Sequence, residues 1–339
     1  MATISEGKFK GIQAVSDERG IIRAAAMDQR GSLQKSLAQE KGVAESEITD
    51  RMMSEFKTAV IKVLSPYASG VLLDPEWGLE AARQRSSGVG LLLAYEQSGY
   101  DNTQPGRMAV LLPDWTVRRS IEAGADCIKL LLYYHPDEDK AVNDQKKAFV
   151  ERVGVECAYY DIPFFLEFVG YGLNGDSKGV EYARQKPRIV AQSMKEFSKD
   201  IYHVDVLKVE IPVDLQYTSG TKSFKGGDAA YSKEEAKDLY LQAAEAAGRP
   251  FIYLSAGVSD AQFRESLEVA GEAGVNYAGV LCGRATWKEG MPVYARQGVS
   301  ALEDWLSDRG VKNIQALNEV LERARSWQDF YGQVETVAR

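Results

Sequence analysis

Short runs of apolar residues alternate along the chain with longer stretches in which apolar positions recur at helical spacing. Short apolar runs bounded by polar segments are typical of strands that are buried on both faces, as in parallel sheets. We expect a strand at each of eight such runs: Ile22–Met27, Gly70–Leu73, Val89–Ala94, Cys127–Leu132, Pro163–Phe168, Val206–Ile211, Phe251–Leu254 and Tyr277–Leu281.

The stretches between these runs are amphipathic with a period near 3.6 residues, which predicts helices between the strands. Two of them carry start signals, because Ser232 precedes Glu234 and Glu235, and Ser259 precedes Asp260. The expected helices are Glu47–Leu64, Thr116–Ala123, Asn143–Tyr160, Lys186–Lys199, Lys233–Ala247 and Asp260–Ala273.

Eight alternating strand and helix units with right-handed crossovers predict a closed (β/α)8 barrel of the TIM type. An open doubly wound sheet is the alternative, but no Gly-x-Gly-x-x-Gly sequence follows the first strand to support it. The chain has 339 residues, and we expect one barrel domain over 1–339. Apolar residues at helical spacing from Ser300 onwards predict that 300–339 form the last helix and a C-terminal helical extension, packed on the barrel or in part on another subunit.

Composition excludes several classes of partner. The chain carries 41 basic and 49 acidic residues, a net charge of -8, with no long basic run, so we expect no nucleic acid and no anionic membrane as a partner. No stretch approaches the roughly 18 apolar residues of a membrane span, and 1–11 lack the apolar core of a signal peptide. We therefore expect a cytoplasmic protein.

Histidine and cysteine are too sparse for a transition-metal site. His135 and His203 are the two histidines, and a three-histidine zinc site needs more, so we expect neither metal nor cofactor. We interpret both histidines as exposed loop residues. Cys127, Cys157 and Cys282 are odd in number and widely spaced, which favours buried free thiols over disulfides.

Lys208 lies in the middle of an apolar strand, where lysine is seldom found. Burial disfavours the ammonium form of a lysine, and the neutral amine that results can attack a carbonyl group. Lys208 is therefore our candidate Schiff-base nucleophile. The alternative is a structural ion pair with Glu210, which lies two residues further along and faces the same side of the strand.

Other polar residues collect at the carboxyl ends of the predicted strands, where active sites of such barrels are built. We expect one of two roles for Lys129: its charge disfavours protonation of Lys208, or it binds a substrate oxygen itself. We expect Glu167 to transfer protons. Asp28 would bind substrate hydroxyls or orient Lys208. The loops after strands seven and eight suit a phosphate group, through Ser255, Gly257, Gly283 and Arg284.

Eight segments together resemble the class I tagatose 1,6-bisphosphate aldolase family. The resemblance keeps the order of the motifs and runs from about residue 8 to 330. The segments are Ala26–Gly31, Leu73–Gly78, Leu92–Glu96, Lys129–Tyr134, Phe164–Glu167, Val206–Glu210, Leu254–Val258 and Leu281–Trp287.

The resemblance implies a metal-free aldehyde-lyase of lactose and galactose catabolism. Such an enzyme reversibly cleaves D-tagatose 1,6-bisphosphate into glycerone phosphate and D-glyceraldehyde 3-phosphate through a lysine imine, with tolerance for related ketohexose bisphosphates. By matching motifs, the imine falls on Lys208, the acid/base role on Glu167 and its partner lysine on Lys129. Site residues after the first strand fall on Asp28 and Gln29, and Arg30 is a weaker candidate for the distal end of the substrate.

The substrate expected from this resemblance is a small phosphorylated sugar, and we expect the protein to act as a homo-oligomer, a dimer. Two alternatives remain: an aldolase for 6-deoxy-6-sulfofructose 1-phosphate, and an aldolase-like sugar-phosphate sensor. The segment 216–230 is longer and more basic than we expect for the family, which leaves the distal group of the substrate open. The overlapping segment 214–228, rich in Gly, Ser, Thr and Lys, is either a lid over the barrel or a solvated loop.

Overall fold

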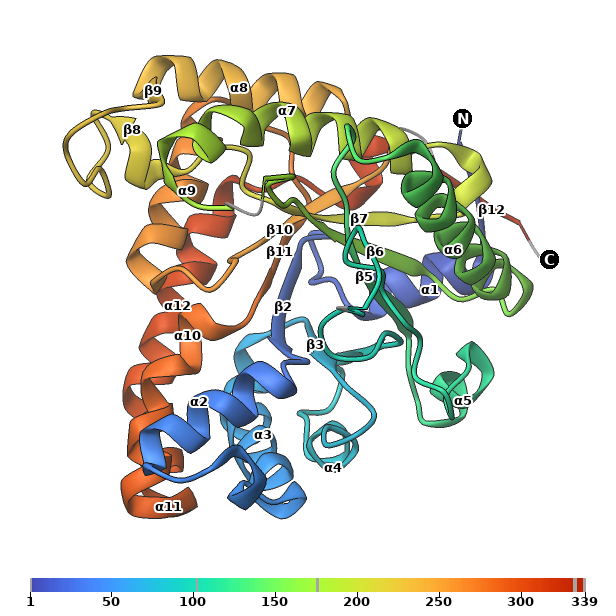
Figure 1. The fold of residues 1–339 in the computed structure, drawn as a ribbon. Helices are drawn as coiled ribbons and strands as arrows, with labels where there is room; N and C mark the ends of the chain where they lie inside the picture. The colour runs from blue at the N-terminus through green and yellow to red at the C-terminus, as the bar shows by residue number, and fades with distance from the viewer. Residues whose placement is uncertain (1, 102, 175–176, 332–333, 338–339) are drawn as a thin grey trace.

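The computed structural model describes residues 2–101, 103–174, 177–331 and 334–337. Parallel strands form a closed barrel in the order β10-β11-β2-β3-β4-β5-β6-β7, surrounded by helices (Figure 1). The predicted (β/α)8 barrel is therefore confirmed, and every predicted strand matches an observed one to within two residues at each end. The barrel strands are β2 (Ile22–Met27), β3 (Gly70–Leu73), β4 (Gly90–Ala94), β5 (Cys127–Tyr133), β6 (Phe164–Val169), β7 (Val206–Glu210), β10 (Phe251–Leu254) and β11 (Gly279–Cys282).

Alternate residues of each strand point into the barrel and towards the helices. In β5, Cys127 belongs to the cluster inside the barrel, whereas Ile128 and Leu130 pack in the layer between barrel and helices. The inner cluster below the site is made of apolar side chains, mostly small or medium in size, with one large ring at Phe165: Ile22, Ala24, Ala26, Leu72, Leu92, Ala94, Phe165, Val206, Ile252 and Leu281. The same alternation brings the side chains of Lys129, Glu167 and Lys208 into the barrel mouth.

The outer helices follow the predicted amphipathic stretches, with one large difference. Ser232 and Ser259 begin their helices with capping boxes, as the start signals predicted. Helix α7 begins at Gly179 instead of the predicted Lys186, because the buried Pro187 is accommodated inside the helix. The helices are α1 (Glu6–Ala14), α2 (Gly31–Lys41), α3 (Asp50–Leu64), α4 (Leu79–Arg83), α5 (Val117–Glu122), α6 (Lys140–Tyr159), α7 (Gly179–Phe197), α8 (Lys233–Glu245), α9 (Asp260–Glu272), α10 (Arg284–Trp287), α11 (Met291–Trp305) and α12 (Val311–Val320).

The C-terminal segment forms the expected helical extension, although its first helix, α11, already begins at Met291. Helix α11 packs on α2 and α3, and α12 packs on α9. The buried residues of the segment after Ser300 include apolar positions at helical spacing: Leu302, Leu306, Ile314, Leu317 and Leu321.

Two small sheets lie outside the barrel and had no clear sequence signal. Strands β1 (Ala2–Ser5) and β12 (Val334–Val337) pair in parallel, so segments from the two ends of the chain lie together (Figure 1). Strands β8 (Thr218–Ser219) and β9 (Tyr231–Ser232) pair across the loop that follows β7. Among the described residues, no helix has the length and apolar character needed to cross a membrane.

The expected environments of the histidines and cysteines are confirmed with one exception. Cys127, Cys157 and Cys282 are buried free thiols, and His203 is exposed. The prediction that His135 is exposed is wrong, since this residue is only 2% exposed. Its Nδ1 accepts a hydrogen bond from the backbone N–H of Asp137, and its ring packs near Tyr171, so the turn before α6 folds over it.

Gly279 allows β11 to approach β2 where the barrel closes. Its φ is +130°, and a Cβ atom here would lie 2.0 Å from the carbonyl oxygen of Ile22. We expect Gly279→Ala to lower the free energy of unfolding by at least about 2 kcal/mol, from backbone strain and overpacking together. Gly42→Ala is the control, because its φ is +67° but no atom lies within 4 Å of the added Cβ. Denaturant unfolding of both variants measures the two free energies of unfolding. Equal decreases in the two variants would contradict the role of the close contact.

Candidate active site

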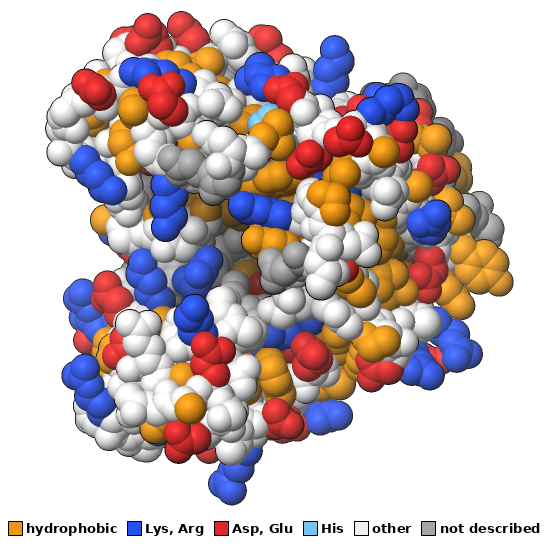
Figure 2. Space-filling view, viewed as in Figure 1, with side chains coloured by type: hydrophobic (Ala, Val, Ile, Leu, Met, Phe, Trp, Pro, Cys, Tyr) orange, Lys and Arg blue, Asp and Glu red, His pale blue; other side chains and the backbone are white. Residues whose placement is uncertain are grey.

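A cavity of about 1250 Å³ opens at the carboxyl ends of the barrel strands. Figure 2 shows a deep hollow in the molecule, with Lys and Arg side chains gathered around its rim. All ten site residues predicted from the sequence line this cavity: Asp28, Gln29, Arg30, Lys129, Glu167, Lys208, Ser255, Gly257, Gly283 and Arg284.

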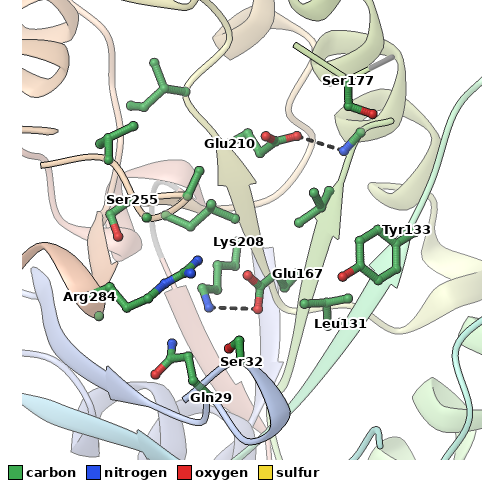
Figure 3. Close-up of a pocket in the computed structure, with 18 of the residues that line it drawn as sticks. Gln29, Ser32, Leu131, Tyr133, Glu167, Ser177, Lys208, Glu210, Ser255 and Arg284 are labelled. Atoms are coloured by element: carbon green, nitrogen blue, oxygen red, sulfur yellow. Dashed lines mark hydrogen bonds and ion pairs between the residues drawn. The ribbon is translucent and has the colours of Figure 1, made fainter. Parts of the chain in front are cut away.

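Lys208 and Glu167 lie side by side on adjacent strands at the bottom of the cavity (Figure 3). The Lys208 side chain is almost fully buried, and its Nζ donates a hydrogen bond of 2.8 Å to Oε2 of Glu167. The same Oε2 lies 2.9 Å from Nζ of Lys129. One carboxylate therefore bridges two lysine side chains, and all three side chains are almost fully buried.

Burial opposes the charged form of Glu167, but Lys129 and Lys208 nevertheless lower the pKa of this carboxyl group. Glu167 is thus held as a carboxylate that can accept a proton. The predicted alternative, in which Glu210 pairs with Lys208, is wrong. Glu210 instead accepts a hydrogen bond of 2.8 Å from the Gly170 N–H and lies 3.4 Å from Nζ of Lys186.

Lys129 is fully buried and has three carboxylate partners. Besides Glu167, its Nζ lies 2.8 Å from Oδ2 of Asp28 and 2.7 Å from Oε1 of Glu96. Burial alone would lower the pKa of Lys129, but the three carboxylates raise it well above the ordinary value. Burial likewise opposes ionisation of Asp28, yet Lys129 and Lys208 hold the pKa of this group well below its usual range. Lys129 is therefore a fixed cation.

Glu96 completes this cluster and was not identified from the sequence as a site residue. Its second carboxylate oxygen accepts a hydrogen bond of 2.9 Å from the Leu131 N–H, and its backbone carbonyl accepts one of 2.6 Å from Arg30. The sequence did contain a signal for Glu96, because this residue lies just beyond an apolar strand, as Asp28 does.

Lys57, on helix α3 outside the barrel, also supports the site and was not identified from the sequence. This lysine of α3 is fully buried, and its Nζ donates hydrogen bonds of 2.7 Å and 2.8 Å to the carbonyl oxygens of Met27 and Gln29. It also pairs with the buried carboxylate of Asp74. Burial lowers the pKa of Lys57, against the opposing effect of Asp74. The two carbonyls flank Asp28, so Lys57 fixes the backbone that carries it.

Gln29 and Arg30 differ in how many of their polar atoms already bind protein groups. Gln29 Nε2 donates to Asp28 at 3.2 Å, whereas the buried Gln29 Oε1 has no partner among the described residues. Arg30 is 3% exposed and its guanidinium is held by Glu76, at 3.1 Å, and by the carbonyl oxygen of Glu96. Gln29 thus has a free acceptor for a substrate hydroxyl, while Arg30 is largely occupied by protein groups.

The loops after β10 and β11 bring Arg284 close to the backbone of Gly257. A Cβ atom at Gly257, whose φ is +79°, would lie 2.8 Å from Nη2 of Arg284. At Gly283 a Cβ atom would lie 3.0 Å from Nε2 of Gln29. Within the part of the chain that the structure describes, the Arg284 guanidinium has no hydrogen-bond or ion-pair partner. A free guanidinium beside glycine backbone and Ser255 suits a tetrahedral anion.

The segment 214–228 forms part of the cavity wall. The carboxylate of Glu265 on α9 accepts hydrogen bonds from the N–H groups of Lys222, at 2.5 Å, and Ser223, at 2.9 Å. Asp214, Gln216, Ser223 and Lys225 line the cavity.

Comparison with known proteins identifies relatives over nearly the whole chain. The model of the DeoC/LacD family aldolases matches residues 22–289. A tagatose 1,6-diphosphate aldolase 2 of Enterococcus faecalis is 50% identical over 329 residues, which cover 96% of this chain and 97% of that protein. The tagatose 1,6-diphosphate aldolase of Listeria monocytogenes is 45% identical, covering 99% and 98% of the two chains.

Solved structures share the fold at low sequence identity. A fructose-bisphosphate aldolase from Plasmodium falciparum superposes with a TM-score of 0.62 at 13% identity, covering 96% of this chain and 94% of that one. An archaeal fructose 1,6-bisphosphate aldolase gives a TM-score of 0.56 at 15% identity, covering 91% and 97%. The family model spans most of the barrel and the relatives span almost the full length, so this chain belongs to the DeoC/LacD family of aldolases.

Proposed function

We propose that the protein is a class I aldolase that reversibly cleaves D-tagatose 1,6-bisphosphate into glycerone phosphate and D-glyceraldehyde 3-phosphate. The observation that carries this proposal is the buried Lys208 amine, 2.8 Å from the Glu167 carboxylate at the bottom of the cavity. The names of relatives that are 45% to 50% identical supply the substrate.

Imine formation begins when the neutral Lys208 amine attacks the C2 carbonyl carbon of the open-chain ketose. The proton that Lys208 must lose can pass to Glu167 Oε2, its hydrogen-bond partner. Protonated Glu167 then donates to the carbinolamine hydroxyl, which leaves as water and gives a protonated imine. Lys129 lies 2.9 Å from the same carboxylate oxygen and stabilises its charged form between these steps.

Cleavage then requires a base for the C4 hydroxyl proton. Glu167 is a carboxylate again after water loss, and its lowered pKa keeps it so. As the proton leaves O4, the C3–C4 bond breaks, its electron pair passes to the imine, and the aldehyde departs. Protonation of the enamine at C3 and hydrolysis of the imine release glycerone phosphate and regenerate the Lys208 amine.

Substrate orientation depends on the remaining site residues. The phosphate beside the ketone would bind Arg284, Ser255 and the backbone at Gly257 and Gly283, which adjoin one another around the barrel. Asp28 and the free Oε1 of Gln29 are placed to accept hydrogen bonds from substrate hydroxyls. The proposal also includes a cytoplasmic location, expected from the composition, and a homodimer acting in lactose and galactose catabolism, for which the family resemblance is the support.

The function is tested by steady-state kcat/KM for tagatose 1,6-bisphosphate, fructose 1,6-bisphosphate and 6-deoxy-6-sulfofructose 1-phosphate, measured side by side. We expect the two bisphosphates to be cleaved and the sulfonate to be a poor substrate. A preference for the sulfonate would replace the proposed substrate, and absence of cleavage for all three would reject the enzymatic function.

Lys208 should be the residue that carries the imine. Borohydride added with glycerone phosphate should inactivate the protein irreversibly and leave one reduced triose phosphate per chain, since hydride converts the imine to a stable secondary amine. Peptide mapping by mass spectrometry locates the adduct. The fully buried Lys129 is the internal control, and an adduct on Lys129 would contradict the assignment of the nucleophile.

Glu167→Gln should still form the imine but cleave slowly, because the amide keeps the shape of the side chain without its proton transfer. We expect kcat to fall by about 10² to 10⁴. Thermal melting of the same preparation separates chemistry from stability. Turnover near that of the wild type would remove Glu167 from the mechanism.

Lys129→Met should make stability depend on pH in the opposite sense to the wild type. Without the ammonium, the buried carboxylates of Asp28, Glu96 and Glu167 lose their shared partner, at a cost of about 3 to 5 kcal/mol near pH 8. The folded-state pKa values of Asp28 and Glu167, which Lys129 lowers in the wild type, should rise above the unfolded values, so the folded variant binds extra protons as the pH falls and recovers stability. Melting temperatures from pH 5 to pH 8 measure this. A deficit independent of pH would contradict the charge argument.

A further inference from the structure

Arg107 is a cation in the cavity wall to which the reaction above gives no role. It belongs to the loop between β4 and α5, which folds back on itself through antiparallel bridges between Glu96 and Leu111 and between Asp101 and Met108. Its φ of 53° is a left-handed backbone conformation that a residue with a side chain seldom adopts. Residues held in such conformations cluster at active sites and ligand-binding sites.

Three aromatic rings surround the Arg107 guanidinium. Its central carbon lies 4.8 Å from the ring centroid of Tyr171, 5.3 Å from that of Tyr100 and 5.9 Å from that of Tyr133. These distances fall within the range of about 6 Å over which a ring attracts a cation. The rings therefore fix the position of the guanidinium without neutralising its charge.

No anion of the protein pairs with Arg107 among the described residues. The carboxylate of Glu138 instead accepts a hydrogen bond of 2.8 Å from the Tyr171 hydroxyl. Lys146 donates to the same hydroxyl at 2.8 Å and adds positive charge beside it. A guanidinium presents a fork of donors that matches the oxygens of a phosphate, and here that fork is unoccupied.

Tyr182 gives a second and independent sign of a missing ligand. Its side chain lines the same cavity, the residue is 9% exposed, and its buried hydroxyl has no partner within the described part of the chain. A Cβ atom at Gly170 would lie 2.7 Å from that hydroxyl, so the glycine leaves room beside it. A buried hydroxyl without a partner is costly, and a bound oxygen would remove the cost.

The position of Arg107 matches the far end of an extended substrate. Strands β11 and β5 are four places apart in the ring β10-β11-β2-β3-β4-β5-β6-β7 and so face each other across the barrel. Arg284 follows β11, and Arg107 lies over Tyr133 at the end of β5. Figure 3 shows Arg284 and Tyr133 on opposite sides of Lys208 and Glu167. A ketose with its first phosphate at Arg284 therefore points its other end towards Arg107.

We propose that Arg107 and Tyr182 bind the distal phosphate of the bisphosphate substrate, the one that leaves with the aldehyde product. The inference rests on the proposed aldolase function and names the residues that select a bisphosphate over a monophosphate. Arg30, the sequence candidate for this end, is engaged by Glu76 and the Glu96 carbonyl, whereas the Arg107 guanidinium is free to bind the anion.

The test compares Arg107→Gln with wild type on two substrates, tagatose 1,6-bisphosphate and tagatose 1-phosphate, which lacks the distal phosphate. We expect kcat/KM for the bisphosphate to fall by about tenfold to a hundredfold, mainly through KM, as for loss of a charged hydrogen bond. The kcat/KM for the monophosphate should stay within about twofold of the wild-type value, since this substrate lacks the phosphate that Arg107 would bind. Tyr182→Phe should show the same selectivity with a smaller, severalfold loss, that of a neutral hydrogen bond.

Arg118→Gln is the matched control, because Arg118 lies on α5 with its side chain 61% exposed and carries the same charge. This variant should have the same kcat/KM as the wild type for both substrates. If Arg107→Gln lowered kcat/KM equally for both substrates, Arg107 would only shape the loop, which would contradict the proposal. An unchanged kcat/KM for the bisphosphate would overturn it as well. A wild-type protein that cleaves neither ketose would instead reject the aldolase function, and this inference with it.

Discussion

The ammonium group of Lys129 is the interaction on which the geometry of the site depends. Its three carboxylate partners come from the end of β2, the residues after β4 and the interior of β6, so one cation joins separate parts of the barrel. A buried charge without partners costs several kcal/mol, which means that each strand must reach its register for the cluster to be satisfied. The same contacts orient Glu167 towards Lys208. The charges needed for chemistry are thus also the charges that hold the barrel mouth together.

A second buried lysine repeats this arrangement one layer further out. Lys57 joins the carbonyls on either side of Asp28 to the carboxylate of Asp74, in the loop after β3. Lys57 thus ties the loop after β3 to the loop after β2, and a hydrogen bond from the Trp77 N–H holds Asp74 within its own loop. Precise placement of Asp28 therefore rests on a backbone that is anchored from helix α3, and the reacting groups do not have to supply that rigidity themselves.

The barrel and most of the site were predictable, because parallel strands leave simple marks in a sequence. Buried parallel strands appear in the sequence as apolar runs. A polar residue at the carboxyl end of such a run lies at the barrel mouth, where the active site is built. Lys57 could not be recognised, since a lysine within an amphipathic helix usually extends its amine to solvent. Pro187 concealed the first turns of α7, and the proline after His135 suggested an exposed turn where the chain folds over the ring. Arg107 lies in a loop without periodicity, so its ring partners become visible only in three dimensions.

Strands β1 and β12 lie at opposite ends of the sequence and pair over four residues, Ala2–Ser5 with Val334–Val337. The barrel strands β2 to β11 lie within residues 22–282, whereas the partner of β1, residues 334–337, lies beyond all of them. Contacts between distant segments form late, because the intervening chain must first be ordered. We therefore expect the small sheet of β1 and β12 to form after the barrel, on strands that contribute no residue to the site.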